Sequence, residues 1–222
     1  TGVGFRLGFV VIQTAGDISN FFSNIWPISF FSFEDLRLFF SLVLIAISCI
    51  IMGAGIPTTA TYIILVAVAA PALAQLGIEP LVAHFFVFYY GVLADITPPV
   101  ALAAYAASGI AKSNPFKTGN TAFRLGIAKA LVPFVFVYSP SLLLITGEFQ
   151  TDQLLITLAG TLIGIALIGI AFSGYWFRNL KSYEQIIIGI GSLFFVAPGT
   201  SSMIVGFLII LPMLFLQFYK KD

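Results

Sequence analysis

Long apolar runs separated by short polar or charged segments dominate this chain. Residues 38–78 carry no charged side chain, and residues 80–111 carry only His84 and Asp95 as groups that titrate near or below neutral pH. A transmembrane helix needs about 20 apolar residues at about 1.5 Å each. The pattern predicts an all-α, polytopic integral membrane protein. Beyond residue 112, crossings are predicted at residues 119–147, 153–174, 185–197 and 203–218.

Two of the apolar runs are interrupted by short polar segments that contain proline. Residues 53–61 have the sequence GAGIPTTAT, and residues 95–99 have the sequence DITPP. Unpaired backbone groups in lipid are costly unless they line a cavity or hold a ligand. Broken helices at membrane depth are therefore where transporters bind solutes and ions. The structural alternative is a pair of proline kinks repaired by neighbouring helices.

The run at residues 38–78 has two interpretations, which are two complete crossings or a re-entrant helical hairpin whose tip is residues 53–59. Each arm beside that tip has about 16 residues, or about 24 Å of helix, against a hydrocarbon core of about 30 Å. These lengths favour the hairpin. Residues 80–111 are then a transmembrane helix broken at 95–99, and the two interruptions are expected to face each other near the middle of the membrane.

Both interruptions have chemistry that suits an ion or a carboxylate. Gly53 and Gly55 tolerate backbone conformations that other residues resist, and Pro57 stops a helix. Hydroxyl groups are presented by Thr58, Thr59 and Thr61. Thr97 before two prolines repeats this arrangement. Such turns expose carbonyls at the end of one half-helix, which suit Na⁺, and N–H groups at the start of the next, which suit an anion.

Asp95 is the most informative single residue. A carboxylate between apolar neighbours in a membrane must be paired, ion-bound or protonated, and it is therefore a candidate functional group. The alternative is a cap that accepts N–H bonds from the second half-helix, with Pro98 near its first position. For His84, packing or an interfacial position is favoured over a proton relay. Three tyrosines flank the second interruption and either face a cavity or pack, namely Tyr89, Tyr90 and Tyr105.

The basic residues predict the orientation of the chain. They fall into three groups: Lys112, Lys117, Arg124 and Lys129; Arg178 and Lys181; and Lys220 and Lys221. Cytoplasmic loops of membrane proteins are rich in Lys and Arg. Placing all three groups in the cytoplasm lets the four downstream crossings alternate, and the C-terminus is then cytoplasmic.

Composition excludes several classes of function. Apolar residues make up 59% of the 222 and charged residues 9%, against about 25% charge in soluble domains. Ten basic against nine acidic side chains argue against nucleic acid as a partner, whereas membrane lipid is expected. Cys49, the only cysteine, is expected to pack as a small residue. One Cys, one His and one deep Asp form no metal cluster or catalytic constellation, so neither enzyme activity nor a cofactor is expected.

Three ordered strings together resemble a known family. They are GAGIPTTATYIIL at residues 53–65, VAHFFVFYYG at 82–91 and DITPPVALAAYAA at 95–107. They are similar to the large membrane subunit of tripartite ATP-independent periplasmic (TRAP) transporters, in particular the fused-permease form that works with a TAXI-type binding protein. The similarity covers about residues 38–144. Residues 148–222 resemble the additional C-terminal helices of that form.

The resemblance implies an elevator-type secondary transporter in the cytoplasmic (inner) membrane of a bacterium or archaeon. A periplasmic binding protein would deliver a small organic acid, and a cation gradient would drive uptake. Because Asp95 is absent from many relatives, Na⁺ and H⁺ both remain candidate coupling ions. The implied substrate and ion contacts are Gly55, Pro57, Thr58, Thr59, Asp95, Thr97 and Pro98, with Na⁺ candidates at Thr58, Thr59 and Thr97. A channel-like or structural membrane subunit is the alternative.

The family architecture has two inverted repeats, of which this chain shows one. The N-terminal half and the small-subunit-like helices are expected outside the sequence, which has no initiator Met and begins at Thr1 as a fragment would. Four segments are predicted: a Phe-rich interfacial or scaffold arm at 1–37, half of a transport domain at 38–111 (hairpin 38–78, broken helix 80–111), a cytoplasmic loop and transmembrane helix at 112–147, and additional transmembrane helices at 148–222.

Overall fold

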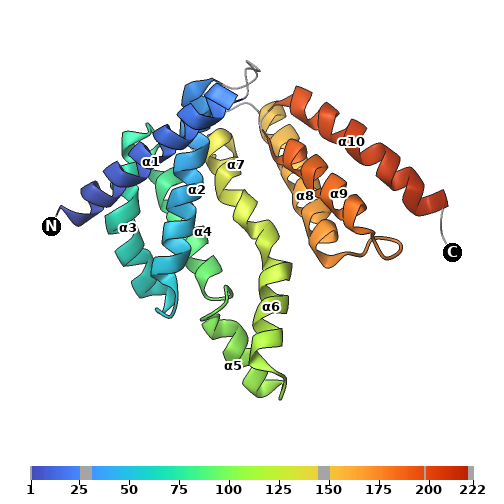
Figure 1. Ribbon diagram of the computed structural model, residues 1–222, viewed down its shortest axis with the longest axis horizontal. Coiled ribbons are helices and arrows are strands. Elements are labelled where there is room, and N and C mark those ends of the chain that lie inside the picture. Colours follow the sequence, from blue (N-terminus) through green and yellow to red (C-terminus); the bar gives the residue numbers. More distant parts are fainter. Residues whose placement is uncertain (1, 26–31, 145–150, 198, 220–222) are drawn as a thin grey trace. The chain divides into compact units, whose positions relative to one another are not determined.

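The computed structural model describes residues 2–25, 32–144, 151–197 and 199–219, and these residues are predominantly helical (Figure 1). The α-helices are α1 (Val3–Ile25), α2 (Phe33–Gly53), α3 (Thr58–Gln75), α4 (Pro80–Ala94), α5 (Leu102–Ile110), α6 (Pro115–Gly126), α7 (Val132–Tyr138), α8 (Thr151–Ser173), α9 (Ser182–Val196) and α10 (Thr200–Tyr219). Two 3₁₀ helices, η1 (Ile127–Leu131) and η2 (Pro140–Leu143), flank α7. The chain divides into two compact units, residues 1–119 and residues 120–222.

Five helical segments in the described residues are long and apolar enough to cross a membrane. They are Phe33–Gly53, Thr58–Gln75, Pro115–Tyr138, Thr151–Ser173 and Thr200–Gln217. The apolar helices α4 and α9 are shorter, with 15 residues each. The predicted all-α, polytopic membrane fold is confirmed.

Helices α2 and α3 form a hairpin whose arms are longer than the sequence predicts. Ser32 caps α2, because its hydroxyl accepts the N–H of Asp35 while the Asp35 carboxylate accepts the N–H of Ser32. The cap starts the helix at Phe33, five residues before the expected position. The arms have 21 and 18 residues, or about 31 and 27 Å, so the expectation of about 16 residues each is wrong. Arms of these lengths suit two crossings as well as a re-entrant hairpin, which therefore stays a prediction.

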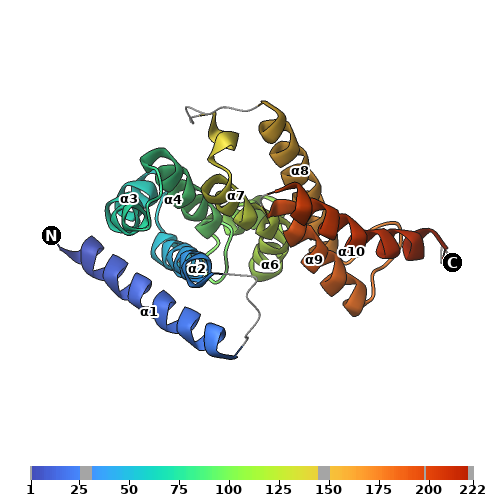
Figure 2. The ribbon, with the colours of Figure 1, turned by 90° about the horizontal axis from the view of Figure 1, so that it is seen from above.

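In the first unit, α2, α3 and α4 pack against one another, and α1 lies across α2 and α3 (Figures 1 and 2). The approach of α1 to α3 is close, because a β-carbon built on Gly4 would lie 2.7 Å from the carbonyl oxygen of Ala67. Pro71, inside α3, has no N–H to donate to that carbonyl four residues before it. Glycine in α1 thus fits beside a carbonyl that proline has left without its helical donor. The assignment of residues 1–37 to an interfacial or scaffold arm stays a prediction, and residues 1 and 26–31 of this segment lie outside the described residues.

The segment after α5 forms a nearly continuous helix from α6 to α7. It begins at Pro115 rather than at the expected residue 119, because the side-chain carbonyl of Asn114 accepts the N–H of Lys117 and proline suits the first helical position. Its α-helical part ends at Tyr138, before the expected end. Residues 145–147 of the predicted crossing lie outside the described residues.

In the second unit, α9 packs against both α8 and α10. Glycines bring these helices together, since a β-carbon on Gly160 would lie 2.7 Å from the carbonyl oxygen of Phe195 and one on Gly206 would lie 3.0 Å from that of Gly191. The observed bounds of α8, α9 and α10 are within three residues of the predicted crossings. Lys220 and Lys221, which support the cytoplasmic C-terminus, lie outside the described residues.

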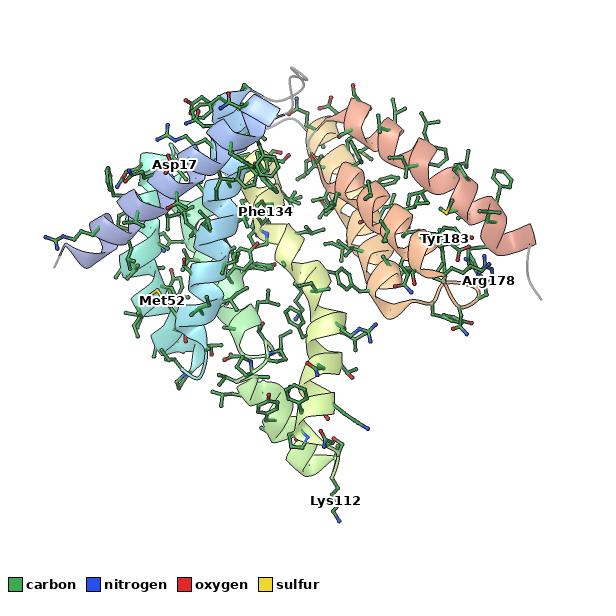
Figure 3. All side chains as sticks on the ribbon, in the orientation of Figure 1. Asp17, Met52, Lys112, Phe134, Arg178 and Tyr183 are labelled. Atoms are coloured by element: carbon green, nitrogen blue, oxygen red, sulfur yellow. The ribbon has the colours of Figure 1, made fainter. Side chains whose placement is uncertain are left out.

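Arg178, in the α8–α9 connection (Figure 3), belongs to a polar cluster that ties this connection to α9 and α10. The guanidinium of Arg178 donates to both carboxylate oxygens of buried Glu184, at 3.2 and 2.6 Å. The side-chain amide of buried Gln217, on α10, donates to the same carboxylate at 3.5 Å. Glu184 also accepts the backbone N–H of Lys181 at 2.9 Å. The cluster fixes three parts of the second unit at one end of its helices.

Candidate functional site

The hairpin turn, residues 54–57, and the break, residues 95–101, lie against each other in the first unit. A β-carbon built on Gly53 would lie 3.0 Å from the β-carbon of Ala94, the last residue of α4. One built on Gly55 would lie 3.3 Å from Cγ1 of Val100. The two interruptions are thus brought together, as the sequence predicts.

This juxtaposition gathers four helix ends at one place. The C-terminal ends of α2 and α4 meet through Gly53 and Ala94, while α3 begins three residues after Gly55 and α5 begins two residues after Val100. Helix C-termini present carbonyl oxygens with partial negative charge, and helix N-termini present N–H groups with partial positive charge. The site therefore offers groups for a cation and for an anion side by side.

The hairpin turn owes its shape to glycine and proline. Gly55 has φ +83°, in the left-handed region that glycine adopts without a steric penalty. The N–H of Ile56 closes the turn on the carbonyl of Gly53 at 3.3 Å. Pro57 then precedes α3 and provides no side-chain cap for it. The chain reverses within four residues and leaves the start of α3 uncapped. Met52, which Figure 3 labels, lies in the last turn of α2, next to the hairpin turn.

The first turn of α3 is open. Within the described residues, none of the backbone N–H groups of Thr58, Thr59 and Ala60 meets an acceptor, whereas the N–H of Thr61 bonds to the carbonyl of Pro57. The side chains of Thr58 and Thr59 are exposed. Because these donors and hydroxyls share one turn, they can bind an anionic group together.

Thr61, whose hydroxyl was expected to be presented at the hairpin tip, is buried instead. Its hydroxyl donates to the carbonyl of Ile56 at 3.0 Å, and its methyl group lies 2.9 Å from where a β-carbon on Gly53 would be. It therefore holds the hairpin turn to α3. The only sequence signal for this role is its place in the GAGIPTTAT string, four residues after Pro57.

The break between α4 and α5 spans residues 95–101, two residues more than expected. The N–H of Thr97 bonds to the carbonyl of Ala94, and its hydroxyl donates to the carbonyl of Leu93 at 2.7 Å. The hydroxyl oxygen keeps lone pairs that can coordinate a cation. The Pro98–Pro99 peptide is cis, and Ala101 has φ +34°, which is rare for a residue other than glycine.

The carboxylate of Asp95 is half-buried and makes no hydrogen bond or ion pair with any residue that the structure describes. The capping alternative is wrong in this fold, because α5 begins at Leu102 with Ala101 in the cap position. Pro98 is accordingly not at the start of that helix. Asp95 instead ends α4, and its backbone carbonyl, not its carboxylate, accepts the N–H of Ala103 at 3.1 Å. Its carboxylate remains available to a ligand.

The remaining candidates have identifiable roles. The phenol of Tyr105 donates to the carbonyl of Pro99 at 2.7 Å and so holds the break from α5. Tyr90 is buried and its ring packs 4.9 Å from that of Phe86. Cys49 is buried as expected. Nδ1 of His84 lies 2.7 Å from the phenol oxygen of Tyr62, a partner that the sequence did not predict.

Oxygen atoms dominate the site, and metal-binding side chains do not cluster there. In the described parts of the chain, no three His, Cys, Asp or Glu residues come together in a way that could hold a metal ion. The available cation ligands are carbonyls, threonine hydroxyls and the carboxylate of Asp95, which are hard donors.

The described residues combine apolar helices of membrane-spanning length with a hairpin and a broken helix in contact, an arrangement that many membrane transporters share. Residues 1–151 match the family described as tripartite ATP-independent periplasmic transporter, DctM component. The chain belongs to this family, and it is a membrane component of a solute transport system rather than a member of an enzyme family. Components of this family work with a periplasmic binding protein and a small membrane component. No curated protein and no solved structure was found to match the chain.

Proposed function

We propose that this chain carries half of the substrate and ion site of a secondary transporter that takes up small organic acids, coupled to a gradient of Na⁺ or H⁺. The observation that carries the proposal is the meeting of four helix ends where the hairpin turn contacts the break. A site with both helix polarities can hold a carboxylate and its companion cation next to each other.

Each predicted contact has a part in this mechanism. The open first turn of α3, with Thr58 and Thr59, holds the substrate carboxylate through N–H groups and hydroxyls. The hydroxyl of Thr97 and the carbonyls of both interruptions bind the cation. Asp95 either coordinates Na⁺ or carries H⁺. Gly55, Pro57 and Pro98 shape the two turns that expose these groups.

Transport is proposed to follow alternating access, with residues 38–111 moving as part of a transport domain against a scaffold. The left-handed conformation of Ala101 supports a functional role for the break, because strained backbone persists where the surrounding structure imposes it. A TAXI-type periplasmic binding protein would deliver the substrate. The other half of the site and small-subunit-like helices would come from outside this sequence, and the assembly would lie in the cytoplasmic membrane with the C-terminus inside the cell.

The test is uptake by the complete transporter in proteoliposomes. Thr58→Val removes a hydroxyl from the anion side, and Asp95→Asn removes the charge from the cation side. We expect the first variant to raise the half-saturating substrate concentration and the second to change the dependence on Na⁺ or on pH. Thr14→Val and Asp17→Asn, both on exposed positions of α1, are the matched controls. Unchanged rates and ion dependence in both site variants would refute the site assignment.

The alternative of a channel-like or structural subunit makes a different prediction in the same vesicles. A carrier gives saturable uptake that depends on the cation gradient and on the binding protein. A channel gives flux that follows the substrate gradient alone. A structural subunit leaves flux unchanged when the site is altered.

A further inference from the structure

We propose that Tyr62 and His84 are positioning residues for this site, because the hydrogen bond between them fixes the first turns of α3 on α4 and thereby holds the hairpin turn against the break. The proposal rests on the proposed function, since it assigns the pair to the site formed there. Neither residue is itself placed at the hairpin turn or in the break.

The pair joins the two helices directly. The phenol oxygen of Tyr62, on α3, lies 2.7 Å from Nδ1 of His84, on α4. The phenol donates when Nδ1 is unprotonated, and Nδ1 donates to the phenol oxygen when it carries a proton, so either tautomer allows the bond. The Tyr62 ring also meets the Phe88 ring edge-on, with centroids 5.9 Å apart. Both polar side chains are half-buried, which makes their pairing worth more than a surface contact.

A second attachment lies one residue earlier on α3. The methyl group of Thr61 fits against α4, because it lies 3.3 Å from where a β-carbon on Gly91 would be. His84 and Gly91 are seven residues apart, or about 10 Å along α4. Adjacent side chains of α3 thus contact α4 at two separated points. Two such points fix both the rotation and the register of α3, which one contact alone cannot do.

The register set in this way reaches the site through Thr61. Its hydroxyl bonds to the carbonyl of Ile56 in the hairpin turn, and its methyl group also faces Gly53 at the end of α2. A rotation of α3 that moved Tyr62 away from His84 would move Thr61 and the first turn with Thr58 and Thr59. The polar pair therefore acts on the site through backbone placement, without touching a ligand.

The experiment compares three variants of the complete transporter in proteoliposomes. Tyr62→Phe and His84→Leu each remove the hydrogen bond and keep most of the packing, whereas His84→Asn retains a polar group near the position of Nδ1. We expect the first two to raise the half-saturating concentrations of substrate and coupling cation by about 2- to 10-fold, the range that corresponds to one hydrogen bond. His84→Asn should restore most of the loss. The double variant Tyr62→Phe/His84→Leu should be no worse than either single variant.

A second measurement does not depend on transport. Hydrogen exchange of the backbone at residues 53–61 in the purified transporter should be faster in Tyr62→Phe than in the unmodified protein, with little change in α10. Tyr183→Phe, an exposed phenol on α9, is the matched control and should change neither readout (Figure 3).

The outcomes separate this inference from the proposed function. If Thr58→Val alters substrate dependence but Tyr62→Phe alters neither half-saturation nor exchange at 53–61, the positioning role is refuted and the site stands. A fall in maximal rate and folded yield alone, with half-saturation and exchange unchanged, also refutes it. If Thr58→Val and Asp95→Asn have no effect, the proposed function fails, and a positioning role for this site fails with it.

Discussion

A β-carbon added to Gly55 would lie 3.3 Å from Cγ1 of Val100, so the hairpin turn touches the break at a position that has no side chain. Gly55 also has φ +83°, which residues with a side chain rarely adopt. Two independent constraints, backbone conformation and space, therefore meet at one residue. Together they let the hairpin turn approach the break closely, which brings four helix ends to one place.

Gly55→Ala is expected to destabilise the protein and to impair uptake. The left-handed conformation alone costs about 1–2 kcal/mol for a residue other than glycine, and the added methyl group also pushes the turn away from Val100. Thermal unfolding in detergent and uptake in proteoliposomes measure the two effects. Gly77→Ala is the matched control, because Gly77 has φ +75° but nothing within 4 Å of its added β-carbon. Equal effects of both variants on uptake would show that contact with the break is unimportant.

Tyr105→Phe should weaken the break without removing a ligand-binding group. It deletes the hydrogen bond from the phenol to the carbonyl of Pro99, which is worth about 0.5–1.5 kcal/mol. We expect faster hydrogen exchange at residues 95–103 and a lower unfolding temperature. Tyr175→Phe, on an exposed position of the α8–α9 connection, should change neither quantity. Unaltered exchange in Tyr105→Phe would mean that the break is held by other contacts.

Gly4→Ala should loosen α1 from α3. The added methyl group would lie 2.7 Å from the carbonyl oxygen of Ala67, a backbone atom that cannot rotate away, and overpacking of this kind costs about 1–3 kcal/mol. Gly16→Ala tests the same exchange in the same helix where nothing lies within 4 Å. Since alanine favours helix over glycine by about 1 kcal/mol, that control should be neutral or stabilising. The unfolding temperature should therefore fall in Gly4→Ala and stay the same or rise in Gly16→Ala, and an equal fall in both would contradict the close packing of α1.

Glu184→Gln should strongly destabilise the second unit. It leaves the guanidinium of Arg178 half-buried without its counter-charge, and breaking a buried ion pair costs about 3–5 kcal/mol. Replacing both residues with Met should cost less than the single change, because no uncompensated charge remains. Glu34→Gln is the control, since the pair of Glu34 and Arg37 is exposed and worth about 0–1 kcal/mol. Thermal unfolding compares all three, and a mild effect of Glu184→Gln would show that the cluster does not hold the helices.

The same cluster predicts a dependence of stability on pH. Glu184 precedes the apolar part of α9. Burial raises the pKa of its carboxyl group. Hydrogen bonds from Arg178 and from the backbone N–H of Lys181, together with the positive charges of both residues, outweigh burial and lower that pKa below its ordinary value. A lowered pKa stabilises the folded state above the unfolded pKa of about 4.3, and this contribution is lost as pH falls through the folded pKa. The difference in stability between the unmodified protein and Glu184→Gln should therefore shrink on acidification below about pH 4. A constant difference down to pH 2 would contradict it.

The sequence alone determined the helical membrane fold, the positions of the two interruptions and the family. Runs of apolar residues that long can satisfy their backbone groups in lipid only as helices, and glycine and proline interrupt such helices wherever they cluster. These are local properties, so the predicted crossings from α8 to α10 lie within three residues of the observed helices. Ser32 shows the limit of such local predictions, because it caps α2 and the helix therefore begins at Phe33, five residues earlier than predicted.

Only the tertiary structure decided which side chains meet. The contact of Gly55 with Val100, the bond between Tyr62 and His84, and the bond between Gln217 and Glu184 join residues 22 to 45 positions apart. Such pairs depend on how helices rotate and cross, which is set by close packing rather than by the period of apolar residues. Because α5 begins at Leu102, the Asp95 carboxylate does not cap that helix, which rules out the capping alternative that the DITPP string had left open. The chemical groups of the candidate residues could be identified from the sequence, whereas the candidate site consists of helix ends that only the fold brings together.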